Sequence, residues 1–135
     1  MKITDFIKEN LLYLDGGMGT LLQARGMKPG ELPERWNISH PEVITKIHKA
    51  YYDAGSHVVN INTFGANSLK FSLEELDQIV QAAVKNARAA AEASSADQPK
   101  WIALDIGPCG KLLSPYGTLE FEDAVSVLPI PFVWA

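Results

Sequence analysis

A glycine-rich segment that begins with an acid is the part of this sequence best suited to chemistry. It reads Asp15-Gly16-Gly17-Met18-Gly19-Thr20 and follows a short apolar stretch. Glycines let the backbone approach a ligand closely, and free N–H groups at a helix start attract an anion. The adjacent Asp15 carboxylate could hold an ammonium group. A cation site beside an anion site predicts amino-acid binding, with a tight turn that binds nothing as the alternative.

Two common phosphate-binding patterns do not fit this segment. In a G-x-G-x-x-G pattern that starts at Gly17, Leu22 stands in the place of the third glycine. No G-K-[ST] triplet is present either, which excludes a Walker loop. A carboxylate therefore suits the segment at least as well as a phosphate does.

Polar residues also close two later apolar stretches. Residues 58–63 end in Asn62 and Thr63, and residues 101–106 carry Asp105 near their end. Ligands of parallel β/α folds bind at the carboxyl ends of the strands. We therefore expect these side chains to meet Asp15 at one site. In the alternative interpretation the aspartates only cap turns, which explains one strand end better than three in succession.

Strand-like apolar stretches alternate with segments of helical spacing along the whole chain. Strands are expected at 11–14, buried, and at 58–63 and 101–106. Helices are expected at 4–9, 20–25, 41–54, 73–91 and 119–127, with a loop over 27–38. Ser39 and Ser72 each begin an S-x-x-E pattern, which predicts a capping box at the next helix. This order predicts an α/β fold with a parallel sheet, either doubly wound or a (β/α)8 barrel.

Composition narrows the possible classes of function. The 135 residues suit one domain, and 47% hydrophobic with 21% charged residues indicates a globular protein. A net charge of -4, with no basic run, argues against nucleic acid or an anionic membrane as partner. Charged residues interrupt the N-terminal segment, so no signal peptide is expected. Cys109 is the single cysteine, which excludes an internal disulfide and favours the cytoplasm.

The remaining metal-binding residue types form no recognisable site. His40, His48 and His57 match no metal-binding spacing, so structural or surface roles are expected. One cysteine cannot build a structural zinc site, and no histidine lies close in sequence to activate Cys109 as a nucleophile. We interpret Cys109 as a small loop residue.

Four segments in the same order resemble the homocysteine S-methyltransferase family, most closely the homocysteine-binding domains of cobalamin-dependent methionine synthases. They are Leu14–Thr20, Pro33–Asn37 with His40-Pro41, Asn62–Asn67, and Asp105–Leu113. The resemblance covers about residues 5–125. It implies a (β/α)8 TIM barrel, of which this chain would supply about the first three βα units and would be incomplete.

The resemblance also implies a site and a reaction. Asp15 and the amides of Gly16, Gly17 and their neighbours would hold the amino and carboxylate groups of homocysteine, and Asn62, Thr63 and Asp105 would line the same barrel mouth. The family transfers a methyl group to the homocysteine thiol, which a zinc ion on three cysteines keeps as a thiolate. In methionine synthase the donor is methylcobalamin. Betaine- and S-methylmethionine-dependent relatives have similar loops, so the donor stays open.

The sequence departs from the family pattern in two ways. The zinc cysteines belong to later strands, and Cys109 is not one of them, so zinc and cobalamin are expected only in full-length members. Residues 1–125 would be the N-terminal part of the barrel. Residues 126–135 are expected to form a divergent apolar tail with two prolines, as a shifted reading frame or a misjudged gene end would produce. We expect no turnover by the chain alone. Its expected partners are homocysteine, and either a second copy or a complementing C-terminal barrel fragment.

Two other readings belong to different classes. A small doubly wound domain could serve as a ligand-binding or regulatory module, with Asp15 and the glycines as its site. Another barrel enzyme, a lyase or an isomerase, would instead place a phosphate in the loop at 16–20.

Overall fold

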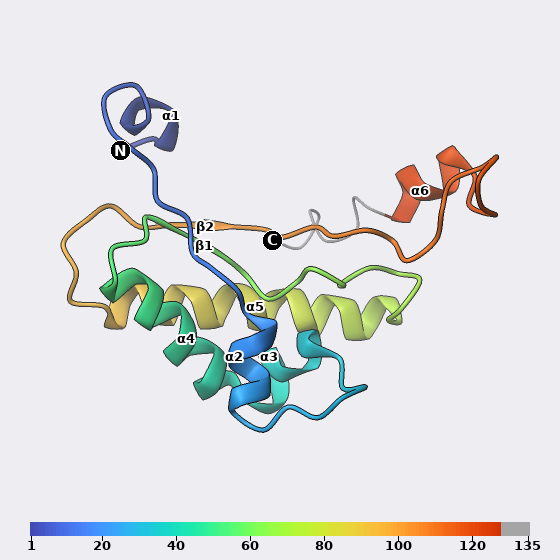
Figure 1. The fold of residues 1–135 in the computed structure, drawn as a ribbon, viewed down its shortest axis with the longest axis horizontal. Helices are drawn as coiled ribbons and strands as arrows, with labels where there is room; N and C mark the ends of the chain where they lie inside the picture. Colours follow the sequence, from blue (N-terminus) through green and yellow to red (C-terminus); the bar gives the residue numbers. More distant parts are fainter. Residues whose placement is uncertain (128–135) are drawn as a thin grey trace.

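The computed structural model describes residues 1–127, and a layer of helices lies along one side of its strands (Figure 1). The longest elements are two helices that pack against each other and against the strands. The elements in chain order are α1 (Ile3–Phe6), α2 (Gly19–Ala24), the 3-10 helix η1 (Pro33–Arg35), α3 (Trp36–Ser39), α4 (Pro41–Asp53), β1 (Val58–Asn60), α5 (Leu73–Ala93), β2 (Trp101–Ala103) and α6 (Phe121–Val127).

The strands are parallel, as the alternating order of elements predicts. Val58 lies opposite Trp101, and Asn60 lies opposite Ala103. Leu14 adds a single parallel bridge to Val58 on the other side of β1. The three strand segments therefore lie side by side in their sequence order.

Amphipathic spacing explains why α5 forms and where it packs. Its buried residues recur every three or four positions, and this stripe faces β1 and the neighbouring helices. Ser72 caps its first turn by accepting a hydrogen bond from the Glu75 N–H (3.2 Å), as its S-x-x-E pattern predicts. On α4, Tyr52 is fully buried and its hydroxyl donates to the Trp101 carbonyl (2.9 Å). This bond joins the helix layer to β2.

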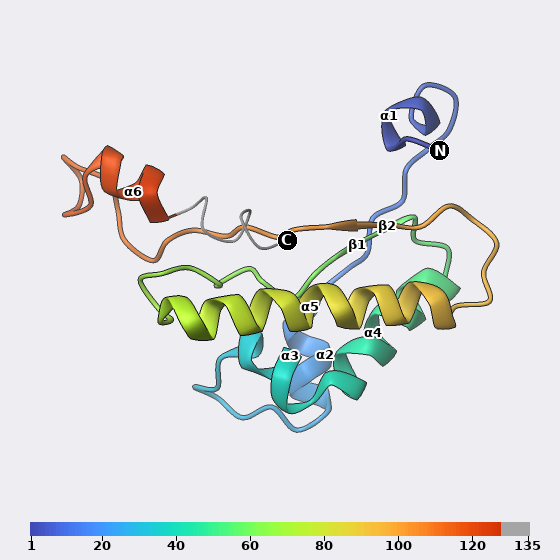
Figure 2. The same ribbon diagram turned by 180° about the vertical axis from the view of Figure 1, so that it is seen from behind.

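Side chains of β1 alternate between two faces of the sheet. Val59 and Ile61 pack among Ala83 and other small residues of α5. Asn60, which lies between them in sequence, points to the face away from the helices because strand side chains alternate. Both views show α4 and α5 on the same side of the strands (Figure 2).

The first predicted strand is wrong in extent and in burial. Residues 11–14 make one bridge only, and Leu11 and Leu14 are 75% and 58% exposed. Among the described residues no further strand pairs with this segment on its outer side, so its apolar side chains lie at an open edge. The predicted strands 58–63 and 101–106 shorten to the three residues of β1 and of β2.

Two further local predictions are wrong. The expected loop at 27–38 contains η1 and the start of α3. The capping box expected at Ser39 does not form, because Ser39 is itself the last residue of α3. Its hydroxyl donates to the Arg35 carbonyl (3.2 Å) and lies 2.7 Å from the His40 ring. His40 occupies the N-cap position of α4 and makes no side-chain cap there.

The two ends of the described chain lie at opposite ends of the molecule (Figure 1). Phe6 of α1 packs near the Trp101 ring, with ring centroids 5.2 Å apart.

The expected helix at 119–127 is found as α6 from Phe121 onward. The predicted apolar tail at 126–135 lies outside the described residues from position 128. Within residues 1–127, no helix combines the length and hydrophobicity needed to cross a membrane.

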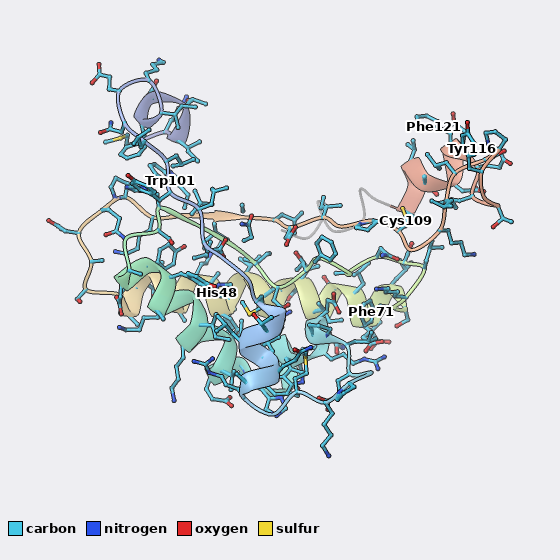
Figure 3. All side chains as sticks on the ribbon, viewed as in Figure 1. His48, Phe71, Trp101, Cys109, Tyr116 and Phe121 are labelled. Atoms are coloured by element: carbon cyan, nitrogen blue, oxygen red, sulfur yellow. The ribbon has the colours of Figure 1, made fainter. Side chains whose placement is uncertain are left out.

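His48 is a fully buried titratable side chain of the helix layer. It lies on α4 (Figure 3), it is fully buried, and neither ring nitrogen has a hydrogen-bond partner among the described residues. Burial lowers the pKa of His48 to about 4. The folded protein therefore holds this ring neutral, in agreement with the structural role that the sequence predicts.

We predict that His48 makes the fold sensitive to acid. Between about pH 6.5 and pH 4 the unfolded chain binds a proton at this ring and the folded chain does not, so stability falls as pH falls. The full effect is about 3 kcal/mol, from a pKa difference of roughly 2.5 units. Urea unfolding at pH 7, 5.5 and 4.5 should show it, and His48→Leu should flatten the dependence. Equal slopes for both proteins would contradict the assignment.

Candidate functional site

The carboxyl ends of the three strand segments meet at one cavity of about 340 Å³, a volume suited to a small ligand. It lies where parallel β/α folds place their ligands. The residues that line it come from the glycine segment, from η1, and from the ends of β1 and β2. They are Asp15, Gly16, Gly17, Met18, Gly19, Pro33, Glu34, Asn60, Ile61, Asn62, Phe64 and Asp105.

Most of the residues that the sequence singled out are brought together here. Asp15, the run Gly16–Gly19, Asn62 and Asp105 all line the cavity. Thr20 and Thr63 do not line it. The buried Thr63 hydroxyl instead donates to the Asp105 carbonyl (2.8 Å), so this side chain fixes the backbone that carries the Asp105 carboxylate.

Asp15 is held by both of its carboxylate oxygens. Oδ1 accepts from the Asn60 amide Nδ2 (2.7 Å), and Oδ2 accepts from the Asn60 backbone N–H (2.9 Å). A carboxylate has about four acceptor positions, so each oxygen keeps capacity for another donor. The side chain is thus fixed in place and still able to bind a cation at the cavity wall.

Two carboxyl groups of the cavity, those of Asp15 and Asp105, have raised pKa values. Burial raises the pKa of Asp15, the two bonds from Asn60 lower it in part, and the nearby Asp105 charge raises it further. Burial also raises the pKa of Asp105. Both shifts show that the charged forms lack full compensation here, so a cation in the cavity would be stabilised.

The glycine segment presents backbone to the cavity. Within residues 1–127, the N–H groups of Gly16 and Gly17 have no hydrogen-bond acceptor. The Tyr51 hydroxyl donates to the Gly17 carbonyl (2.7 Å), and a Cβ at Gly16 would lie 2.9 Å from that hydroxyl oxygen. Glycine at this position therefore allows Tyr51 to reach the segment and leaves two donors free for an anion.

Sequence reasoning missed several lining residues: Pro33, Glu34, Asn60, Ile61 and Phe64. The alternation of β1 was a usable signal for Asn60, because it shares a strand face with Asn62. Pro33 and Glu34 fall in a segment that carried the family resemblance without being assigned to the site. Glu34 is only 4% exposed, and its Oε1 accepts from the Gly65 N–H (2.7 Å).

A group of buried amides fastens η1 to the end of β1. Asn37 Nδ2 donates to the carbonyls of Glu34 (2.9 Å) and Asn62 (2.7 Å). Asn62 Nδ2 donates back to the Pro33 carbonyl (2.7 Å), and Asn86 of α5 donates to the Asn37 carbonyl (3.0 Å). Glu34 therefore has a fixed position on the cavity wall.

The zinc site that the resemblance implies does not fit the residues present. The chain has one cysteine, Cys109, where three thiolates are required. It lies in the loop after β2 (Figure 3), and the part of the chain that the structure describes holds no group of three His, Cys, Asp or Glu side chains able to bind a metal ion. These residues can bind and orient a ligand, and no metal-dependent step follows from them.

Comparison with solved structures identifies similar folds. The homocysteine methyltransferase MmuM from Escherichia coli, in its oxidised form, is 25% identical with a TM-score of 0.68 over 80% of this chain. The metallated form is 24% identical, with a TM-score of 0.66 over 78% of this chain. The apo form is 30% identical, with a TM-score of 0.53 over 67% of this chain. The match covers 41%, 41% and 32% of those chains, so this chain spans less than half of their length.

A family model agrees with these structures. The model described as homocysteine S-methyltransferase matches residues 12–128, which is most of the chain. The matched range includes every residue that lines the cavity. The chain therefore belongs to the homocysteine S-methyltransferase family.

Proposed function

We propose that this chain is one part of a homocysteine S-methyltransferase and that its cavity holds the amino-acid end of homocysteine. The observation that carries the proposal is the convergence of Asp15 with the free N–H groups of Gly16 and Gly17 on one small cavity. A carboxylate and backbone donors side by side suit the ammonium and carboxylate of one zwitterion. Asn62 and Asp105 would complete the same wall.

We further propose that residues 1–125 form the first βα units of a (β/α)8 barrel. The parallel strand segments in sequence order, the helices on one side and the cavity at the carboxyl ends support this architecture. So does the match to less than half of each E. coli chain. The remaining strands of such a barrel would also cover the exposed edge at Leu11 and Leu14.

The methionine synthase type, with zinc and cobalamin in the full-length protein, is the parent activity that we propose. The metallated form of the E. coli relative supports a metal in full-length family members. When bound, such a metal keeps the homocysteine sulfur as a thiolate. Residues of this chain would contribute binding and orientation of the amino-acid end. A small doubly wound module remains the alternative, and the one-sided helix layer favours the barrel.

Substitution of Asp15 should separate binding from folding. Asp15→Asn keeps the size of the side chain, and Asn60 can still pair with it, but the negative charge is lost. We expect L-homocysteine to bind at least about 10-fold more weakly, as loss of a charge-assisted hydrogen bond predicts. Isothermal titration calorimetry measures this. The control Asp5→Asn removes an exposed acid that pairs with Lys8, and it should bind normally. Equal affinities for Asp15→Asn and the unaltered chain would refute this role.

We also predict that the purified 135-residue chain forms no methionine. Three thiolates are needed to hold the family's zinc, and the chain has one. The assay supplies homocysteine and zinc with methylcobalamin, betaine or S-methylmethionine as donor, and it measures methionine by mass spectrometry. Zinc-dependent methionine formation with any of the three donors would contradict the prediction.

A further inference from the structure

Glu34 is a buried carboxylate in which one of the two oxygens has no hydrogen-bond partner among the described residues. Its Oε1 accepts from the Gly65 N–H (2.7 Å), and its Oε2 is buried with no hydrogen-bond partner among residues 1–127. The exposed Lys70 ammonium approaches Gly65, yet it makes no ion pair with Glu34 in this part of the chain. Leaving a buried charged acceptor unpaired is costly, so a partner from outside the chain would stabilise it.

The position of Glu34 is fixed by its surroundings. Its backbone carbonyl accepts from Asn37, which also binds the Asn62 carbonyl. The preceding residue, Pro33, accepts from Asn62. With the backbone held on both sides and Oε1 held by Gly65, the side chain stays on the cavity wall. Glu34 is therefore preorganised for a ligand rather than recruited by one.

The charges around the cavity all have one sign. Its lining includes the carboxylates of Asp15, Glu34 and Asp105, and no Lys, Arg or His is among the lining residues that the structure describes. One carboxylate balances the ammonium of a zwitterion, and backbone N–H groups serve the opposite end. The additional acids favour ligands with a cationic group and oppose purely anionic ones.

From these contacts we infer that Glu34 is a specificity-determining residue: together with Asp15 it selects ligands that carry a protonated amino group. The inference rests on the proposed function for the identity of the natural ligand. It adds a second ammonium acceptor, which comes from η1, to the cavity that Asp15 also lines. Thiol acids that lack the amino group are rejected because they leave this acceptor unpaired and bring a further negative charge.

The test uses Glu34→Gln in the full chain. Glutamine keeps an oxygen that can accept from the Gly65 N–H, and it removes the negative charge. The matched control is Glu31→Gln, since exposed Glu31 also accepts from a backbone N–H, that of Lys28 (2.7 Å), and does not line the cavity. Three probes are titrated by calorimetry at pH 7: L-homocysteine, 3-mercaptopropylamine, which lacks the carboxylate, and 4-mercaptobutanoate, which lacks the amino group.

We expect Glu34→Gln to bind both amino-bearing probes at least about 10-fold more weakly than the unaltered chain does. The variant should bind 4-mercaptobutanoate as tightly as the unaltered chain, or more tightly. Glu31→Gln should match the unaltered chain. Equal weakening of all three probes would assign Glu34 a purely structural role and overturn the inference, and so would no change. Binding of 3-mercaptopropylamine but not homocysteine, lost in Glu34→Gln, would support Glu34 and refute the proposed function. If neither amino-bearing probe binds the unaltered chain, both ideas fail.

Discussion

The paired hydrogen bonds between Asp15 and Asn60 are the contact on which the cavity depends. Backbone pairing between the first strand segment and β1 is a single bridge at Leu14, and it ends where the cavity begins. The Asp15 side chain continues the pairing by accepting from the backbone and the amide of Asn60. Together with the bond from the Tyr51 hydroxyl to the Gly17 carbonyl, this contact positions the glycine segment at the end of β1. One carboxylate thus stabilises the sheet edge and faces the ligand site.

Side-chain amides of asparagine residues hold the part of the cavity lining that comes from η1. Asn37, Asn62 and Asn86 are buried, and their side-chain amides donate to carbonyls of η1, of α3 and of the segment that follows β1. Buried backbone groups must find partners, and outside regular structure side chains provide them. Truncating Asn37 would therefore unpair carbonyls in two segments at once. Side-chain hydrogen bonds therefore position the cavity lining, most of which lies outside regular elements.

Local sequence signals predicted the fold where local contacts decide the outcome. Ser72 and Ser39 begin the same S-x-x-E pattern, and only Ser72 caps a helix. Ser39 fails because the preceding segment is already helical and uses its hydroxyl at Arg35. The apolar composition of residues 11–14 likewise predicted burial, but burial requires a neighbouring element on the outer side. Spacing along one segment carries no information about that neighbour.

The difference between local and long-range contacts also explains which residues of the site were predicted from the sequence and which were missed. Parallel topology alone places Asp15, Asn62 and Asp105 together, so their positions followed from strand order. The position of Glu34 depends on two contacts between distant parts of the sequence. Glu34 accepts from Gly65, 31 residues away, and the adjoining Asn37 donates to Asn62, 25 residues from Asn37. No periodicity encodes such contacts. The Gly65 N–H offsets part of the cost of burying the Glu34 side chain, but Oε2 has no hydrogen-bond partner within residues 1–127. A site that carries such a cost without a ligand gains stability when a cation binds, which couples occupancy of the cavity to the stability of the fold.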